Sequence, residues 1–182
     1  LAFMERQLGK KRIFADQMDL LGEHSIQMQL PWIQHLYGDV PVVAALIPDP
    51  LRPEPTDGER ATTGEFVQHL RTALDELGGR TLFVSSSDLS HVGPQFSDPG
   101  PVTDQVSAQV DQLDRERLRL FCARDAASFE APFIQQRNVS RWCSIGNMSA
   151  TLRLAAPGSV ELIDYQQTRE PNGAHLVSSA AL

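Results

Sequence analysis

The stretch that decides the fold is residues 81–93, which read Thr-Leu-Phe-Val-Ser-Ser-Ser-Asp-Leu-Ser-His-Val-Gly. Its first four residues form a short apolar run and predict a buried parallel strand. Ligands of α/β proteins gather beyond the carboxyl ends of such strands, so the polar residues that follow are candidates for a site. His91, three residues after Asp88, is the leading candidate.

A second informative stretch is residues 23–32, which read Glu-His-Ser-Ile-Gln-Met-Gln-Leu-Pro-Trp. It places His24 beside Glu23 and opens a segment, 25–36, whose apolar residues recur at helical spacing. Glu23 can orient the imidazole, as carboxylates near functional histidines often do. It can equally be the acidic residue that favours a helix N-terminus. The residues alone leave both interpretations open.

Between these stretches the pattern predicts a βαβ unit. Residues 40–47 form a continuous apolar run that predicts a buried strand, as do residues 81–85. A proline-rich loop at 49–57 and a helix at 59–77 with one apolar face connect them. Crossovers of this kind are nearly always right-handed. We therefore expect the two strands to be adjacent, parallel and central, with the helix packed across them.

Helices and strands continue to alternate along the rest of the chain. The predicted elements are helices at 103–123, 125–136 and 148–155 and strands at 160–166 and 175–181. Asp125 is the expected N-cap of the middle helix, because its side chain can accept a hydrogen bond from first-turn amides. Residues 1–21 also predict a helix, broken near Gly9. With 182 residues the chain can bury one substantial core, so we predict a single α/β domain over 1–182.

Composition argues against two classes of partner. The net charge of −7 disfavours broad nucleic-acid binding, which needs a cationic face to neutralise phosphates. No apolar stretch approaches the roughly 20 residues that span a bilayer, and no signal peptide opens the chain. We therefore expect no nucleic acid, no membrane and a cytoplasmic location.

Three spaced matches resemble one known family. They are the Glu-His-Ser and Leu-Pro of residues 23–31, the Ser-Ser-Asp-x-x-His-x-Gly of residues 86–93, and the lone Cys143 before a helix. In this order they resemble the Memo family, whose bacterial and archaeal members are often called AmmeMemoRadiSam system protein B. The resemblance implies a fold similar to that of the class III extradiol dioxygenases, a three-layer α/β/α sandwich around a largely parallel or mixed sheet. It also implies that the N-terminal part of a longer protein is missing.

The same resemblance implies catalytic roles for three residues. His91 matches the family histidine that projects into the cleft and resembles the acid/base histidine of the dioxygenases. The residues alone also allow a structural histidine held by Asp88 or a loop carbonyl; in the functional interpretation Asp88 fixes its tautomer. His24 matches the histidine of an acidic–His pair that shares the acid/base work. We expect these three residues and Cys143 to line one cleft.

Cys143 is the residue for which the resemblance implies a metal. It matches the family cysteine that forms a three-residue metal site with two upstream histidines, and those histidines are absent from this chain. A thiolate in a three-ligand site suits iron(II), copper or zinc. We expect iron or copper, not retained by this fragment. The alternative for Cys143 is a buried thiol, the role we expect for Cys122 in its apolar helical pattern.

The favoured function is a Memo-like metal-site protein, an oxygen- or redox-linked enzyme related to the extradiol dioxygenases that acts on a small aromatic or phenolic substrate. The competing function is a non-catalytic binding module that uses the same cleft for a peptide or protein partner. The resemblance also implies a radical-SAM protein and a small AMMECR1-type protein as partners. His35, His69 and His175 lack an acidic or histidine partner at ligand spacing, and we interpret them as surface or structural residues.

Overall fold

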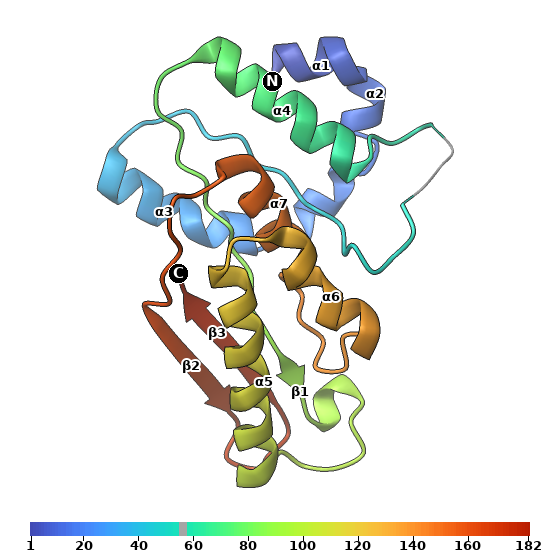
Figure 1. Cartoon of the computed structure of the whole chain (residues 1–182), viewed down its shortest axis with the longest axis vertical. Helices are drawn as coiled ribbons and strands as arrows, with labels where there is room; N and C mark the ends of the chain where they lie inside the picture. The colour runs from blue at the N-terminus through green and yellow to red at the C-terminus, as the bar shows by residue number, and fades with distance from the viewer. Residues whose placement is uncertain (55–57) are drawn as a thin grey trace. The chain divides into compact units, whose positions relative to one another are not determined.

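Two compact units make up the chain in the computed structural model, which describes residues 1–54 and 58–182. Unit 1 comprises Leu1–Pro48 and Arg52–Ser86, and unit 2 comprises Asp49–Leu51 and Ser87–Leu182. Helices and a small antiparallel sheet together confirm the predicted α/β class (Figure 1). The last three residues of the predicted proline-rich loop, 55–57, lie outside the described residues.

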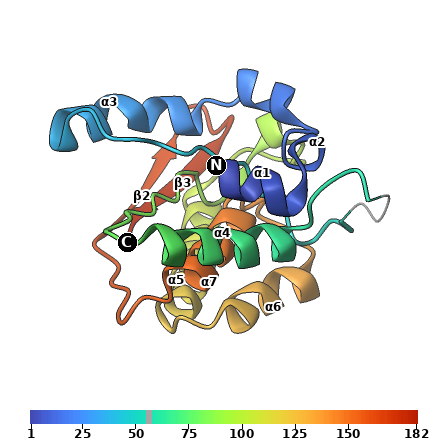
Figure 2. The ribbon, with the colours of Figure 1, turned by 90° about the horizontal axis from the view of Figure 1, so that it is seen from above.

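Unit 1 consists of helices joined by extended segments. Its helices are α1 (Ala2–Leu8), α2 (Lys10–Ile13), the 3-10 helix η1 (Gln17–Leu21), α3 (Ser25–Tyr37) and α4 (Thr63–Leu77). Gly9, with a φ of 83°, separates α1 from α2, which confirms the predicted break at a conformation that favours glycine. Thr62 and Glu65 form a capping box that starts α4 four residues later than predicted. Figure 2 shows α4 beside α1, and the two helices are in contact.

The two parallel strands predicted at 40–47 and 81–85 are wrong. Both segments are extended but neither is part of a sheet, and Val43 and Leu82 are 64% and 62% exposed. Strands are held by hydrogen bonds to a neighbouring strand. Among the described residues, the backbone groups of these two segments make no hydrogen bond to another backbone group. The apolar runs fit a strand, but a run of residues in one segment cannot supply its pairing partner.

The sheet of unit 2 has three strands, all antiparallel. Its strands are β1 (His91–Val92), β2 (Asp164–Arg169) and β3 (Leu176–Ala181), in the order β1-β3-β2. The predicted strand at 175–181 is confirmed as β3, and the one at 160–166 begins later, at Asp164. His91 therefore lies in a short strand paired with Val177, not in a loop beyond a parallel strand.

Helices cover this sheet and enclose the core. They are α5 (Asp104–Cys122), α6 (Ala126–Gln136) and α7 (Ile145–Ala155), preceded by the 3-10 helix η2 (Pro94–Phe96). The predicted cap of α6 is confirmed, since the Asp125 carboxylate accepts a hydrogen bond from the Ala127 amide at 3.2 Å. Figure 1 shows α5 lying across the sheet. None of the described helices combines the length and apolar character needed to cross a membrane.

Aromatic rings fill the centre of unit 2. Phe129 stacks edge-to-face on Phe121 and on Phe133, with ring centroids 5.3 and 5.4 Å apart. The Trp142 ring lies 5.1 Å from that of Phe133 and is almost fully buried. Such contacts contribute stability beyond the area they bury. Through Trp142, the loop before α7 therefore packs against α6.

This core gives a stability prediction with a matched control in the same helix. Phe129 is 0% exposed and Ile134 is 61% exposed, and both lie in α6. We expect Phe129→Ala to lower the free energy of unfolding of unit 2 by about 3–5 kcal/mol, because it leaves a cavity. Ile134→Ala is expected to change it by no more than about 0.5 kcal/mol. Chemical denaturation followed by circular dichroism measures both; equal costs would contradict this packing.

Candidate functional site

Asp88, His91 and Cys143 come together in unit 2, although they arise from two separate segments. His91 is the first residue of β1, and Asp88 lies three residues before it. Cys143 lies in the loop between α6 and α7, next to Ser144, the N-cap residue of α7. The His91 amide donates a hydrogen bond to the Ser140 carbonyl at 2.7 Å, which joins β1 to this loop.

The imidazole of His91 is held in one tautomer. Its Nδ1 lies 3.1 Å from the carbonyl oxygens of both Leu89 and Arg141. Carbonyl oxygens only accept hydrogen bonds, so Nδ1 carries the proton. Nε2 is left facing the Asp88 carboxylate, with Oδ2 at 3.7 Å. The ring also packs edge-on against Phe96, with centroids 5.2 Å apart, so its orientation is fixed on several sides.

Cys143 contacts the same aspartate. Its thiol donates to the Asp88 backbone carbonyl, with Sγ 3.2 Å from the oxygen. The residue is exposed, so the alternative of a buried thiol is wrong for Cys143. Cys122 is half-buried, and burial raises the pKa of its thiol, which suppresses the reactive thiolate form. Of the two cysteines, Cys143 is therefore the one that is accessible to solvent and close to His91 and Asp88.

The loop that carries Cys143 has an unusual backbone. Arg137, Asn138 and Arg141 all have positive φ, at 54°, 48° and 54°. The Asn138 side chain holds this backbone in place. Its amide donates a hydrogen bond to the Trp142 carbonyl and its oxygen accepts one from the Trp142 amide, both at 2.9 Å. Strained residues held by surrounding contacts are common at functional sites.

An ion pair ties this loop to the segment after β1. Arg141 Nη2 lies 2.5 Å from Asp98 Oδ1, and Arg141 Nη1 donates to the His91 carbonyl at 2.9 Å. The hydrogen bond from Arg141 lowers the pKa of Asp98, and the Gly93 amide acts in the same direction. A Cβ at Gly93 would lie 2.7 Å from the Ala174 carbonyl, so only glycine fits here. The pair thus fixes Arg141, whose carbonyl holds His91 Nδ1.

His24 lies in the other unit, at the N-cap position of α3. Its side chain is 79% exposed, and its Nδ1 is 3.8 Å from Glu23 Oε1. The same carboxylate oxygen accepts a hydrogen bond from the Ser25 amide at 2.7 Å, which lowers the pKa of Glu23. This geometry favours the helix N-terminus interpretation of Glu23. That His24 shares a cleft with His91 stays a prediction.

A residue that the sequence reasoning missed, Asp114, lies beneath the site. It is 0% exposed and accepts hydrogen bonds from the residues that directly precede His91 and Cys143. The sequence contains a sign of its burial: Val110, Asp114 and Leu118 are spaced four residues apart and so share one face of α5, which is buried. A carboxylate inside an apolar stripe requires hydrogen-bond donors.

A metal centre is not complete in this part of the chain. Residues 1–54 and 58–182 contain no group of three His, Cys, Asp or Glu side chains placed to hold a metal ion. Asp88, His91 and Cys143 are close, and the Cys143 sulfur contacts the Asp88 backbone carbonyl. The described donors therefore do not by themselves complete the metal site that the resemblance implies.

The arrangement defines a domain whose histidine, aspartate and cysteine are drawn from the segments that the resemblance singled out. The family model described as Memo-like protein matches residues 4–182. The chain therefore belongs to the Memo-like family, as predicted.

Curated relatives agree with this assignment. A MEMO1 family protein of Methanopyrus kandleri is 25% identical over 169 residues, which cover 88% of this chain and 51% of the relative. Another, from Pyrobaculum arsenaticum, is 24% identical over 83% of this chain and 47% of its own length. One from Methanococcoides burtonii is 33% identical over 99 residues, or 50% of this chain and 33% of its own length. The chain spans about half the length of the first two. No solved structure matches it.

The Asp98–Arg141 pair predicts a pH dependence. Because Arg141 lowers the pKa of Asp98 in the folded state, the pair's contribution is fully present above the ordinary value of 3.8. It is lost as the pH falls through the lowered pKa. With both side chains about a third exposed, we expect Asp98→Asn to cost less than about 1 kcal/mol at neutral pH. Urea denaturation at about pH 7 and at a series of pH values below 3.8 should show the difference from wild type shrinking as the pH falls.

Asp111→Asn is the matched control for this measurement, because it breaks an exposed ion pair with Arg115 on α5 that touches no site residue. A cost of Asp98→Asn that persists unchanged in acid would show that the ion pair is not its source.

Proposed function

We propose that unit 2 carries the proton-transferring part of a Memo-like enzyme site, in which His91 acts as acid and base toward the hydroxyl group of a small phenolic substrate. The observation that supports this most is the pair of carbonyls on Nδ1, from Leu89 and Arg141. They hold the proton on Nδ1 and leave Nε2 as the atom that can exchange one. A neutral imidazole nitrogen is a competent base near neutral pH.

Proton transfer then has a defined course. The Nε2 lone pair accepts the phenol proton, which leaves a phenolate and an imidazolium. The Nδ1 proton stays on the ring, hydrogen-bonded to the carbonyls of Leu89 and Arg141. The Asp88 carboxylate lies 3.7 Å from Nε2, the atom that gains the proton. In the reverse step Nε2 returns the proton to the product.

Oxygen- or redox-linked chemistry at Cys143 is the finer part of this proposal. We propose iron or copper there only together with ligands that the described residues do not supply. The Cys143 thiol donates a hydrogen bond to the Asp88 carbonyl, and it would have to lose its proton to bind a metal. Unit 2 is thus proposed to contribute one ligand and the acid/base histidine.

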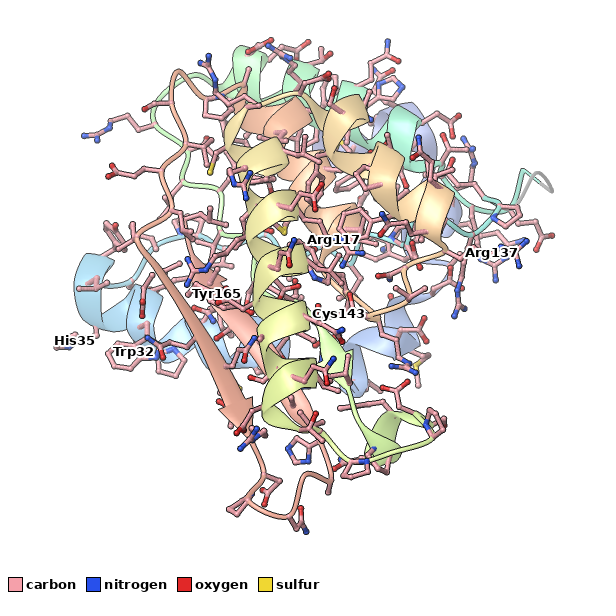
Figure 3. All side chains as sticks on the ribbon, turned by 60° about the horizontal axis from the view of Figure 1, so that its bottom comes forward. Trp32, His35, Arg117, Arg137, Cys143 and Tyr165 are labelled. Carbon is pink, nitrogen blue, oxygen red and sulfur yellow. The ribbon has the colours of Figure 1, made fainter. Side chains whose placement is uncertain are left out.

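A binding module for a peptide or protein partner is the second candidate, and a different feature supports it. Met28, Trp32 and Leu36 are spaced four residues apart on α3 and are 63%, 65% and 67% exposed. Figure 3 shows Trp32 and His35 projecting outward from this helix. Amphipathic helices of this kind bind in apolar grooves of partner proteins. Radical-SAM and AMMECR1-type proteins are candidate partners for this surface.

The acid/base proposal is tested with 4-nitrocatechol, a phenol whose absorbance reports its ionisation. We expect the bound ligand to ionise at a lower pH than it does in buffer, because Nε2 takes its proton. His91→Asn keeps an N–H donor near the two carbonyls but removes Nε2. It should weaken binding about tenfold through loss of a charged hydrogen bond and abolish the absorbance change.

His35→Asn is the control for this titration, since His35 is an exposed histidine on α3. It should bind 4-nitrocatechol as the wild type does. If His91→Asn ionises the ligand as well as the wild type, His91 is not the base.

The metal proposal is tested on the chain itself. After incubation with iron(II) or copper(I) and gel filtration, we expect well under one equivalent of metal, because a single thiolate lacks chelation. Cys143→Ser should remove whatever is retained, and Cys122→Ser should not. Mass spectrometry of the metal content measures all three samples. Stoichiometric retention by the Cys143→Ser protein would rule out Cys143 as the ligand.

A further inference from the structure

The carboxylate of Asp114 accepts hydrogen bonds from four side chains in the interior of unit 2. Oδ1 accepts from Ser90 Oγ at 2.6 Å and from Trp142 Nε1 at 2.7 Å. Oδ2 accepts from Tyr165 OH at 2.9 Å and from Ser178 Oγ. A carboxylate has about four lone-pair positions, so these four donors satisfy it fully.

The two oxygens have different donors, although Ser178, a donor to Oδ2, also accepts a hydrogen bond from the Ser90 amide. Tyr165 lies on β2 and Ser178 on β3, so Oδ2 fastens α5 to the sheet. Ser90 and Trp142 directly precede His91 and Cys143, so Oδ1 fastens the two segments that carry the candidate site. Oδ1 of Asp114 therefore accepts hydrogen bonds from the residue before His91 and from the residue before Cys143.

We propose that Asp114 is a positioning residue, which sets the placement of the His91 imidazole relative to the Cys143 thiol through Ser90 and Trp142. The proposal rests on the site proposed above and adds a residue to it. Asp114 does not touch a reacting atom; it acts through the backbone of the two residues that follow its donors.

Arg117, one turn further along α5, reinforces the same placement. Its Nη1 donates to Ser140 Oγ at 2.6 Å, and the Ser140 carbonyl accepts from the His91 amide. Its guanidinium lies 4.6 Å from the Phe133 ring centroid and 5.8 Å from that of Trp142. Figure 3 labels Arg117, Tyr165 and Cys143 around α5. Burial lowers the pKa of Arg117, and the charge of Asp114 opposes that change.

Removing a single donor separates the two functions of the carboxylate. Ser90→Ala deletes one hydroxyl from Oδ1, and Tyr165→Phe deletes one hydroxyl from Oδ2. Both side chains are buried and both changes are small, so their costs to folding should be similar. Only the first removes a side-chain hydrogen bond from a segment that carries a site residue, because Ser90 directly precedes His91; the hydrogen bonds of the Ser90 backbone to Ser178 remain.

The experiment compares these variants by two readouts that need no substrate. Nuclear magnetic resonance measures the solvent exchange rate of the His91 Nδ1 proton, and peptide mass spectrometry measures the rate of Cys143 alkylation by iodoacetamide. We expect Ser90→Ala to speed the proton exchange at least about tenfold, because the segment that carries Leu89 and His91 loses its hydrogen bond to Asp114 and opens more often. Cys143 alkylation should change by about threefold or more, and Tyr165→Phe should change either rate by less than about twofold.

Two results would overturn the proposal: equal effects of the two variants, which would make Asp114 merely structural, or no effect of either. The 4-nitrocatechol titration separates this failure from failure of the proposed function. If the wild type does not ionise the ligand but Ser90→Ala alone alters the two rates, the positioning role stands and the acid/base role falls. Asp114→Asn is informative only if it folds, and the two hydroxyl deletions do not depend on it.

Discussion

The buried carboxylate of Asp114 is the constraint on which the architecture of unit 2 depends. Burying an unpaired charge costs several kcal/mol or more, so a carboxylate at 0% exposure is tolerated only when its acceptor positions are filled. Its donors lie on β2, on β3, before β1 and before α7. A partly satisfied buried network is worse than an apolar core. The hydrogen bonds of this one carboxylate therefore fix the positions of the sheet, α5 and the loop that carries Cys143 relative to one another.

Helices were predictable because their signal is local. Apolar residues at helical spacing placed α5 and α6 within one or two residues, and Asp125 marked the start of α6 as predicted. The strands at 40–47 and 81–85 were wrong because a strand depends on a partner that its own residues do not reveal. β3 was predicted correctly, and it is the strand that both others pair with. The three-layer arrangement stays a prediction.

The site was predictable only in part. His91 and Cys143 were singled out by motifs, but the expected reason for His91, a loop after a parallel strand, was wrong. What holds its ring are the carbonyls of Leu89 and Arg141, and backbone carbonyls leave no trace in side-chain identities. Asp114 was overlooked because it lies inside a regular helix, where an acidic residue is ordinarily solvated. A charge in line with Val110 and Leu118 is the exception that the spacing could have revealed.

The two units differ in how well they can hold a reacting group. Among the described side chains of unit 1, the buried hydrophobic ones are Met4 and Leu8, whereas unit 2 encloses a cluster of aromatic rings. Unit 1 also has contacts such as the Arg12–Glu65 pair, 2.9 Å apart and partly exposed, and ion pairs of this kind contribute little to stability. Regions with few buried apolar contacts open most readily.

This difference bears on the two histidines. Acid/base catalysis needs a group held in place to within a fraction of an ångström. The contacts of unit 2 fix His91 in that way, through two carbonyls, the Phe96 ring and the segment anchored by Asp114. His24 has an exposed ring beside a carboxylate that is already bonded to the Ser25 amide. A role for His24 therefore requires a contact that would immobilise its ring, and His91 is the residue on which the acid/base proposal rests.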